Sequence, residues 1–343
     1  MKRYKYLDIA RGIGLSLVVI SHSCGLSSYL INFFIPLFFV VSGYIYKGGR
    51  EYGENIKRKA KRLLIPYFEY SAFLLLFFIL MGRTFRETAN SLFGVLYSRY
   101  CLFDTTTRTD NVYLFTVANG AMWYLTAFFV TSLVYHLVID RCLANRRFLV
   151  GCMLVLTALT MALAELPILL PWSIDIAFVG TFFMIVGTLL GRMDFFEKKW
   201  NPLLIAGVFV GYIILSTLNP GINMSIREFG VYGWASVPMF ILIGISGSML
   251  CIWLGKLISN YAIGGLLEYL GKNTIIVLAL HILGLECFEM IAAKIIDVAA
   301  LSGVAVILYH AVRITVAVCG CLVLGKLLDL AKAKLCFNKK AAS

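Results

Sequence analysis

Long apolar runs recur along almost the whole chain, and they restrict its fold more than any other feature. A run of about 20 apolar residues crosses the hydrocarbon core of a bilayer as a helix, because every backbone polar group must be satisfied internally there. We therefore expect an all-α integral membrane protein, a polytopic bundle of about ten transmembrane helices. The expected spans are residues 7–24, 31–47, 63–82, 118–139, 148–165, 173–191, 202–218, 232–255, 273–293 and 299–326.

The composition agrees with a chain immersed in lipid. Hydrophobic residues make up 60% and charged residues 14% of the 343 residues, a balance that would leave a soluble fold without a polar surface. No run of soluble composition is long enough for a separate catalytic domain, and no low-complexity linker interrupts the chain. The first span has no small-residue cleavage site, so we expect it to be retained. We expect one transmembrane domain over residues 1–343.

Basic residues cluster in alternate gaps between the expected spans. With the N-terminus inside, 23 of the 31 Lys and Arg lie in cytoplasmic gaps, six lie outside, and Arg11 and Arg313 fall within spans. Such an excess marks cytoplasmic loops, so we expect a multi-pass protein of a bacterial-type cell membrane with both termini cytoplasmic. The net charge of +13 then reflects orientation in the lipid bilayer, and we expect no nucleic-acid partner. The oligomeric state stays open.

The sequence lacks the usual spacings of metal ligands and of activated serine or cysteine nucleophiles. The nine cysteines form no Cys-x-x-Cys pair, and there is no His-x-x-x-His pair or paired carboxylate set. No serine lies in a Gly-x-Ser-x-Gly turn. We therefore predict that the protein binds no metal.

Arg11 and His22, both in the first span, are the first candidates for chemistry, because ionisable groups inside a membrane are costly. They are eleven residues apart, so their directions around the helix axis differ by only about 20°, and they lie about 16 Å apart along the axis. Arg11, oriented by Asp8, would hold the phosphates of a nucleotide-like donor at the cytoplasmic end, and His22 would lie toward the outer side. In the alternative reading Arg11 only pairs with Asp8 and His22 is interfacial.

Asp8 through Gly12 and Ser21 through Ser23 resemble the Arg-x10-His signature of the membrane-bound acyltransferase type 3 family, including its branch of sugar and exopolysaccharide O-acetyltransferases, the fucose O-acetylase-like branch. Phe34 stands where that branch often has a His. Four further segments follow in order and are similar to family motifs: Pro36-Leu37-Phe38-Phe39-Val40-Val41-Ser42-Gly43-Tyr44, Lys61-Arg62-Leu63-Leu64-Ile65-Pro66-Tyr67, Met122-Trp123-Tyr124-Leu125, and Leu270-Gly271-Lys272-Asn273-Thr274 with the downstream His281.

The resemblance implies that the chain transfers an acyl group, acetyl in that branch, from cytoplasmic acyl-CoA to a hydroxyl of a sugar, lipid-linked glycan or exopolysaccharide. The acyl-CoA is then a donor substrate, and no metal is needed. His22 would take the proton of the acceptor hydroxyl as that hydroxyl attacks the thioester. In a variant of this route His22 carries the acyl group transiently.

Motif residues near the cytoplasmic side are candidates for donor binding. Ser42 and Gly43 are small enough for close helix approach or for passage of a pantetheine arm, and Tyr44 follows them. Lys61 and Arg62 could bind donor phosphates with Arg11, or belong to a basic cluster that holds anionic lipid. Tyr67 could line an acyl tunnel or simply pack.

Other candidates are expected to bind substrate or support the site. Trp123, like Tyr67, could line a tunnel or pack at an interface. His281 lies deep in the ninth span, where it could bind the donor or orient another polar group. Glu286 and Glu289 share a face near the outer end of that span and suit a polyol-binding vestibule, although interfacial solvation also explains them.

Two further expectations concern the outer half of the bundle. Arg313 shares a face with His310 and needs an anion, for which Glu69 or Asp175 is available, as a structural ion pair. The outer segment 83–117, with Tyr97, Tyr100 and Tyr113, suits either a short interfacial helix with a loop that caps a substrate entrance, or a loop alone.

Two other classes of protein compete with the enzyme. A multispan transporter or flippase for a polar glycan-like solute also uses buried charges, but it predicts inverted halves. The sequence has no second copy of the Arg11 and His22 span. A catalytically idle sensor or assembly protein would tolerate replacement of either residue.

Overall fold

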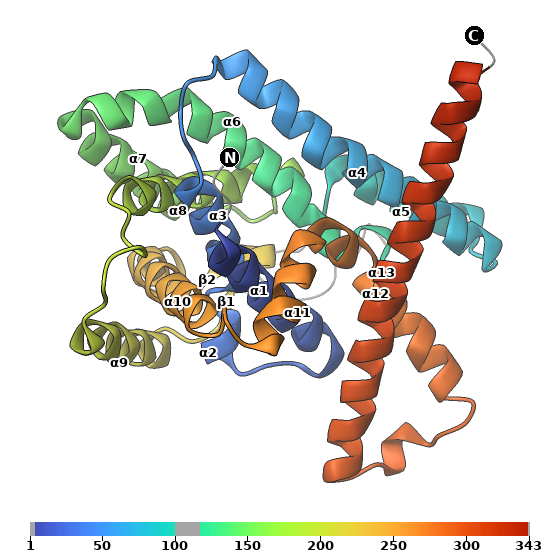
Figure 1. Cartoon of the computed structure of the whole chain (residues 1–343). Helices are drawn as coiled ribbons and strands as arrows, with labels where there is room; N and C mark the ends of the chain where they lie inside the picture. The colour runs from blue at the N-terminus through green and yellow to red at the C-terminus, as the bar shows by residue number, and fades with distance from the viewer. Residues whose placement is uncertain (1–3, 100–116, 342–343) are drawn as a thin grey trace.

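The computed structural model describes residues 4–99 and 117–341, and most of these are helical (Figure 1). Among them, eight helices are long and apolar enough to cross a membrane, so the expected all-α polytopic architecture is confirmed. These eight are α1 (Lys5–Cys24), α4 (Tyr52–Leu80), α6 (Trp123–Ala144), α7 (Arg146–Ala164), α8 (Ile174–Arg192), α10 (Val237–Leu257), α12 (Thr274–Ala292) and α13 (Val304–Ala341).

Two of the ten expected spans are shorter than a full crossing. The span expected at 31–47 is divided into α2 (Ser28–Ile31) and α3 (Phe34–Tyr44), and the span expected at 202–218 is α9 (Pro202–Leu218). Both segments are apolar, but neither reaches the length of the other eight.

The helices also extend beyond the expected spans. α4 begins at Tyr52, well before the expected start at residue 63, so the basic cluster at its cytoplasmic end is helical. α5 (Phe85–Tyr97) occupies the first part of the outer segment and begins with a capping box between Thr84 and Glu87. Tyr97 lies on this helix, while Tyr100 and Tyr113 lie outside the described residues. The expected gap between the eighth and ninth spans holds an additional helix, α11 (Ala262–Lys272).

Short elements connect the helices on the outer side. Two strands, β1 (Ile222–Asn223) and β2 (Glu228–Phe229), pair antiparallel, with Ile222 opposite Phe229 and Asn223 opposite Glu228. The 3₁₀ helices of the described residues are η1 (Val117–Met122), η2 (Pro171–Ser173), η3 (Met224–Ile226), η4 (Gly233–Ser236) and η5 (Val298–Ala300).

α1 lies in the middle of the bundle, where α3, α10, α11 and α12 contact it (Figure 1). Two glycines allow α11 to pack against the N-terminal half of α1. A Cβ on Gly12 would lie 1.9 Å from the Leu267 carbonyl oxygen, and a Cβ on Gly271 would lie 1.8 Å from the Asp8 carbonyl oxygen. Gly12 and Gly271 therefore allow the backbones of α1 and α11 to approach closely. Helix packing explains the glycine in each of these two sequence motifs.

α3 packs just as closely on α8. A Cβ on Gly43 would lie 1.9 Å from the Met184 carbonyl oxygen, and one on Gly187 would lie 2.0 Å from the Val40 carbonyl oxygen. The Thr188 hydroxyl also donates to the Gly43 carbonyl over 3.1 Å. The space beside Gly43 is thus filled by α8, and close helix approach accounts for this glycine.

Replacing Gly43 with Ala should destabilise the protein by about 1–3 kcal/mol, because the added methyl group meets backbone atoms that cannot rotate away. The measurement is the melting temperature of the purified protein in nanodiscs. Gly211→Ala on α9 is the matched control, since a Cβ there meets open space. Equal melting temperatures for the two variants would contradict the close α3–α8 contact.

Candidate functional site

His22 and His281 meet between α1 and α12. His22 Nδ1 lies 2.8 Å from His281 Nε2, and the two imidazole rings are stacked with an interplanar angle of 13°. His281 is fully buried, whereas His22 is exposed on the wall of a cavity. The structure thus brings together two histidines that are 259 residues apart in the chain.

The hydrogen bonds of His281 determine which nitrogen of His22 is free. His281 Nδ1 lies 2.9 Å from the Val277 carbonyl oxygen and 3.0 Å from that of Leu278. Carbonyl oxygens only accept, so Nδ1 carries the proton, and Nε2 of a neutral His281 accepts. His22 must then donate from Nδ1. Its own Nε2 keeps a lone pair, so it can take a proton from a bound group.

The cavity beside His22 has a volume of about 820 Å³. Its lining comes from α1, the α2–α3 break, η1 and the start of α6, the β1–η3 segment, α10 and α12. Trp123 and Tyr124 from α6, Asn32 from the break and Ser225 from η3 are among its lining residues. A volume of this size matches that of small-molecule sites in proteins.

Arg11 lies at the other end of α1, where its Nη1 contacts Asp8 Oδ1 at 3.1 Å. Asp8 is buried and Arg11 is partly exposed. The structure therefore contains the Arg11–Asp8 pair considered from the sequence, and this pair is compatible with either reading, an oriented donor-binding arginine or a simple ion pair.

A lysine that we did not single out from the sequence lies in the same region. Lys59 Nζ donates to Ser42 Oγ over 3.4 Å and lies 4.6 Å from the centroid of the Phe128 ring. Within the described part of the chain, no carboxylate lies within salt-bridge distance of this ammonium group. Lys61 and Arg62, the two predicted donor-binding residues of this cluster, are exposed instead.

Lys59 lies on the buried face of α4. Leu63 and Tyr67 are buried on this helix, and Lys59 precedes them at four-residue intervals, so all three lie on one face. If the sequence had predicted a helix that begins at Tyr52, it would also have predicted that Lys59 lies on the buried face of that helix. The predicted span began at residue 63, because the polar composition of residues 52–62 does not indicate a membrane span.

Two of the predicted tyrosines have structural contacts. Tyr67 is fully buried and donates its hydroxyl to the Val95 carbonyl oxygen over 2.6 Å, which fixes α5 against α4. Tyr44 is buried and accepts a hydrogen bond of 3.4 Å from Tyr6, whose hydroxyl also contacts Glu197. Neither tyrosine lines the cavity beside His22, whereas Trp123 does.

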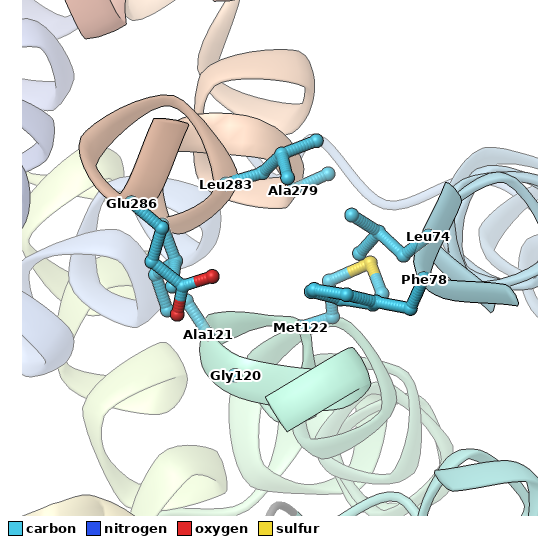
Figure 2. A pocket seen from close by; sticks show the side chains of 9 residues that line it. Leu74, Phe78, Gly120, Ala121, Met122, Ala279, Leu283 and Glu286 are labelled. Atoms are coloured by element: carbon cyan, nitrogen blue, oxygen red, sulfur yellow. The ribbon is translucent and has the colours of Figure 1, made fainter. Parts of the chain in front are cut away.

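Glu286 and Glu289 have different surroundings, and their expected binding of a polyol stays a prediction. Glu286 lines a pocket of about 10 Å³ with residues of α4, η1 and α12 (Figure 2), which has room for roughly one water. This pocket shares Gly120, Ala121 and Ile282 with the cavity beside His22. Glu289 is paired with Arg313, which also donates to the Ser23 carbonyl oxygen over 3.2 Å. The partner of Arg313 is therefore Glu289, not Glu69 or Asp175 as expected, because α13 packs on α12.

Asp175 instead holds two buried arginines, at the end of the bundle that is expected to lie outside. Its Oδ1 accepts from Arg99, and its Oδ2 accepts from Arg227 over 3.0 Å. Arg99 also donates to the Ser225 carbonyl oxygen over 2.8 Å. Burial lowers the pKa of the Arg227 guanidinium, and the charge of Asp175 opposes that shift. We call these three residues the outer ion cluster.

The outer ion cluster fixes one wall of the large cavity. Ser225, whose carbonyl it binds, lines the cavity together with Asn223 and Met224. This cluster could not be predicted from the sequence, because its three charged residues belong to segments that are distant in the chain.

Among the described residues, no group of three or more His, Cys, Asp and Glu side chains could hold a metal ion. A family model described as an acyltransferase domain, that of the acyltransferase 3 family, matches residues 4–326. This stretch includes every candidate residue described above. Neither a curated protein nor a solved structure gives a significant match to the chain.

Asp175→Ala should destabilise the protein by about 3–5 kcal/mol, because it leaves two buried guanidinium groups without their counter-charge. The measurement is the free energy of unfolding in denaturant, on detergent-solubilised protein. Glu54→Ala is the control, since Glu54 pairs with Arg50 at an exposed site and such a pair contributes about 1 kcal/mol or less. Similar losses in the two variants would rule out a structural role for the outer ion cluster.

Proposed function

Because this chain belongs to the acyltransferase 3 family, we propose that it transfers an acetyl group from cytoplasmic acetyl-CoA to a hydroxyl of a sugar, lipid-linked glycan or exopolysaccharide. Family membership supports an acyltransferase over a transporter or an idle sensor. The observation that carries the proposal is the unprotonated Nε2 of His22 on the wall of the large cavity. The distribution of Lys and Arg supports a cell-membrane protein with both termini cytoplasmic.

His22 acts as the general base in this proposal. Its Nε2 takes the proton of the acceptor hydroxyl while the hydroxyl oxygen attacks the thioester carbonyl carbon. The tetrahedral intermediate then expels the CoA thiolate as the carbon–sulfur bond breaks. The thiolate takes the proton from His22, which restores the neutral imidazole and releases CoA as a thiol.

His281 is a positioning residue for His22. It accepts the Nδ1 proton of His22, so it fixes both the tautomer and the orientation of the imidazole. It also stabilises the imidazolium that forms when the acceptor loses its proton. An aspartate has the same relation to the histidine of a serine hydrolase, although here the acceptor is a neutral ring.

The cations at the opposite end of α1 suit the donor. The distribution of Lys and Arg favours a cytoplasmic location for Arg11 and Lys59, and the side chain of Lys59 is directed at Ser42 rather than at a carboxylate. Both can bind the phosphates of CoA. Arg11 and His22 are separated by about 16 Å along the helix, a distance that an extended pantetheine arm can bridge. The thioester can therefore reach His22 while the nucleotide stays near the cytoplasm.

The direct test uses radiolabelled acetyl-CoA and the purified protein in nanodiscs with a panel of lipid-linked sugars. Label in a glycan product from wild type, but not from His22→Ala of equal melting temperature, supports the proposal. If wild type neither binds nor consumes any acyl-CoA, the enzyme assignment is wrong for this chain.

His281→Ala should lower kcat by about 10²-fold or more with little change in either KM, because His22 loses the acceptor that fixes its tautomer. His281→Gln should recover part of this loss, since the Gln carbonyl oxygen can accept the Nδ1 proton. The measurement is the initial rate over a matrix of donor and acceptor concentrations. An unchanged kcat, or no difference between Ala and Gln, would contradict the positioning role.

Lys59→Met should raise the Kd for acetyl-CoA about tenfold, because a charge-assisted hydrogen bond is lost from a partly buried site. Lys61→Met is the matched control: it removes an exposed charge two residues away and should change the Kd much less. The Kd is measured by equilibrium binding of labelled acetyl-CoA at two salt concentrations. If the two variants behave alike, Lys59 has no specific contact with the donor.

A further inference from the structure

Asn32 lies where a membrane-embedded helix is interrupted. α2 ends at Ile31 and α3 begins at Phe34, so Asn32 and Phe33 form the turn between two apolar helices. Irregular backbone at membrane depth is tolerated where it is buried in protein or lines a cavity. In membrane proteins, such interrupted helices often supply binding groups. Asn32 lines the same cavity as His22.

The side chain of Asn32 has no partner in the described part of the chain. Its exposed fraction is 1%, yet neither Nδ2 nor Oδ1 accepts or donates a hydrogen bond. Buried polar groups are normally paired, and leaving one unpaired costs free energy. The side chains next to it, those of Ile31 and Phe33, are apolar and offer it no partner. Because Asn32 lines the cavity, a molecule bound there could supply partners for both atoms.

We propose that Asn32 is a specificity-determining residue that binds two neighbouring hydroxyl groups of the acceptor, and that the acceptor is therefore a polyol such as a sugar. This inference rests on the function proposed above and adds the residue that recognises the acceptor. The amide Nδ2 donates to one hydroxyl oxygen, and Oδ1 accepts the proton of the second hydroxyl. A third hydroxyl is then free to reach His22.

The chemistry of the Asn32 amide favours the acceptor over the thioester group of the donor. A thioester carbonyl only accepts hydrogen bonds, so it could satisfy Nδ2 and would leave Oδ1 unpaired. A pair of hydroxyl groups satisfies both atoms, because a hydroxyl both donates and accepts. The position agrees with this choice, since α2 contacts β1 and β1 lines the same cavity as Asn32, whereas Arg11 and Lys59 do not line it.

Asn219 provides a comparison within the same protein. It is also fully buried, but its Nδ2 donates to the Phe229 carbonyl oxygen and its Oδ1 accepts from Ser236, both over 2.8 Å. Asn219 thus has the satisfied contacts of a structural amide. Asn32 has the same burial without those contacts, which is the arrangement of a binding group in a site without its ligand.

The experiment compares Asn32→Leu with Asn219→Leu in full-length protein in nanodiscs. Leucine keeps the branched shape of asparagine without its polar atoms, and its larger methyl groups can extend into the cavity that Asn32 lines. The acceptors are octyl glycosides of glucose, galactose, fucose and N-acetylglucosamine, with 1-octanol as the acceptor that has a single hydroxyl. We measure the KM for each acceptor, the Kd for acetyl-CoA and the melting temperature.

Asn32→Leu should raise the KM for the best glycoside about ten- to hundredfold and lower the rate ratio of that glycoside to octanol. The Kd for acetyl-CoA should stay unchanged. The melting temperature should stay equal or rise, because an unpaired buried amide is removed. Asn219→Leu should instead lower the melting temperature, since it leaves the Phe229 carbonyl and Ser236 hydroxyl unpaired.

Three results would overturn the inference while wild type remains active: an unchanged KM for glycosides in Asn32→Leu, a weaker Kd for acetyl-CoA, or a fall in melting temperature like that of Asn219→Leu. The first means that Asn32 does not bind the acceptor, the second that it belongs to the donor site, and the third that it is structural. If wild type acetylates no glycoside, the sugar acceptor proposed above fails, and the role of Asn32 fails with it.

Discussion

A polar side chain inside a bilayer must find its partner within the protein, because lipid offers none. The buried charges of Asp175, Arg99 and Arg227 meet that requirement through contacts between distant segments. At a more exposed position, Glu289 joins α12 to α13 through Arg313. Each such contact fixes one helix or loop relative to another. The large cavity keeps its shape because its walls are tied in this way, and His22 is held in one of them by His281.

The sequence predicted the helical membrane fold and the approximate position of each span, because hydropathy reports directly on transfer into lipid. It did not predict the break at Asn32, since a single polar residue hardly changes the hydropathy of a window. It also missed α11, whose packing on α1 depends on Gly12 and Gly271 rather than on its own hydropathy. Both features depend on contacts between helices that are distant in the chain. The break places Asn32 in the wall of the cavity, and α11 packs against the helix that carries Arg11 and His22.

Part of the geometry of the candidate site could also be predicted from local spacing. The spacing of Arg11 and His22 defines one helix face, and local geometry carries over into the fold. The meeting of His22 and His281 depends on how α12 packs on α1, which spacing along the chain does not encode. In the basic cluster of α4, Lys59 lies on the buried face of the helix and Lys61 on the exposed face, and the sequence alone does not show which face is buried. Whether these residues bind substrate stays a prediction.

α3 has eleven residues, so its axis is about 16 Å long, little more than half the thickness of the hydrocarbon core. It borders both the cavity and α1. Nearly all of its residues are buried, and α1, α8 and α10 pack around it, so protein rather than lipid surrounds this short helix. The cavity that begins at Phe34 therefore occupies membrane depth that a full-length helix would fill, and irregular backbone is tolerated there because it lines that cavity.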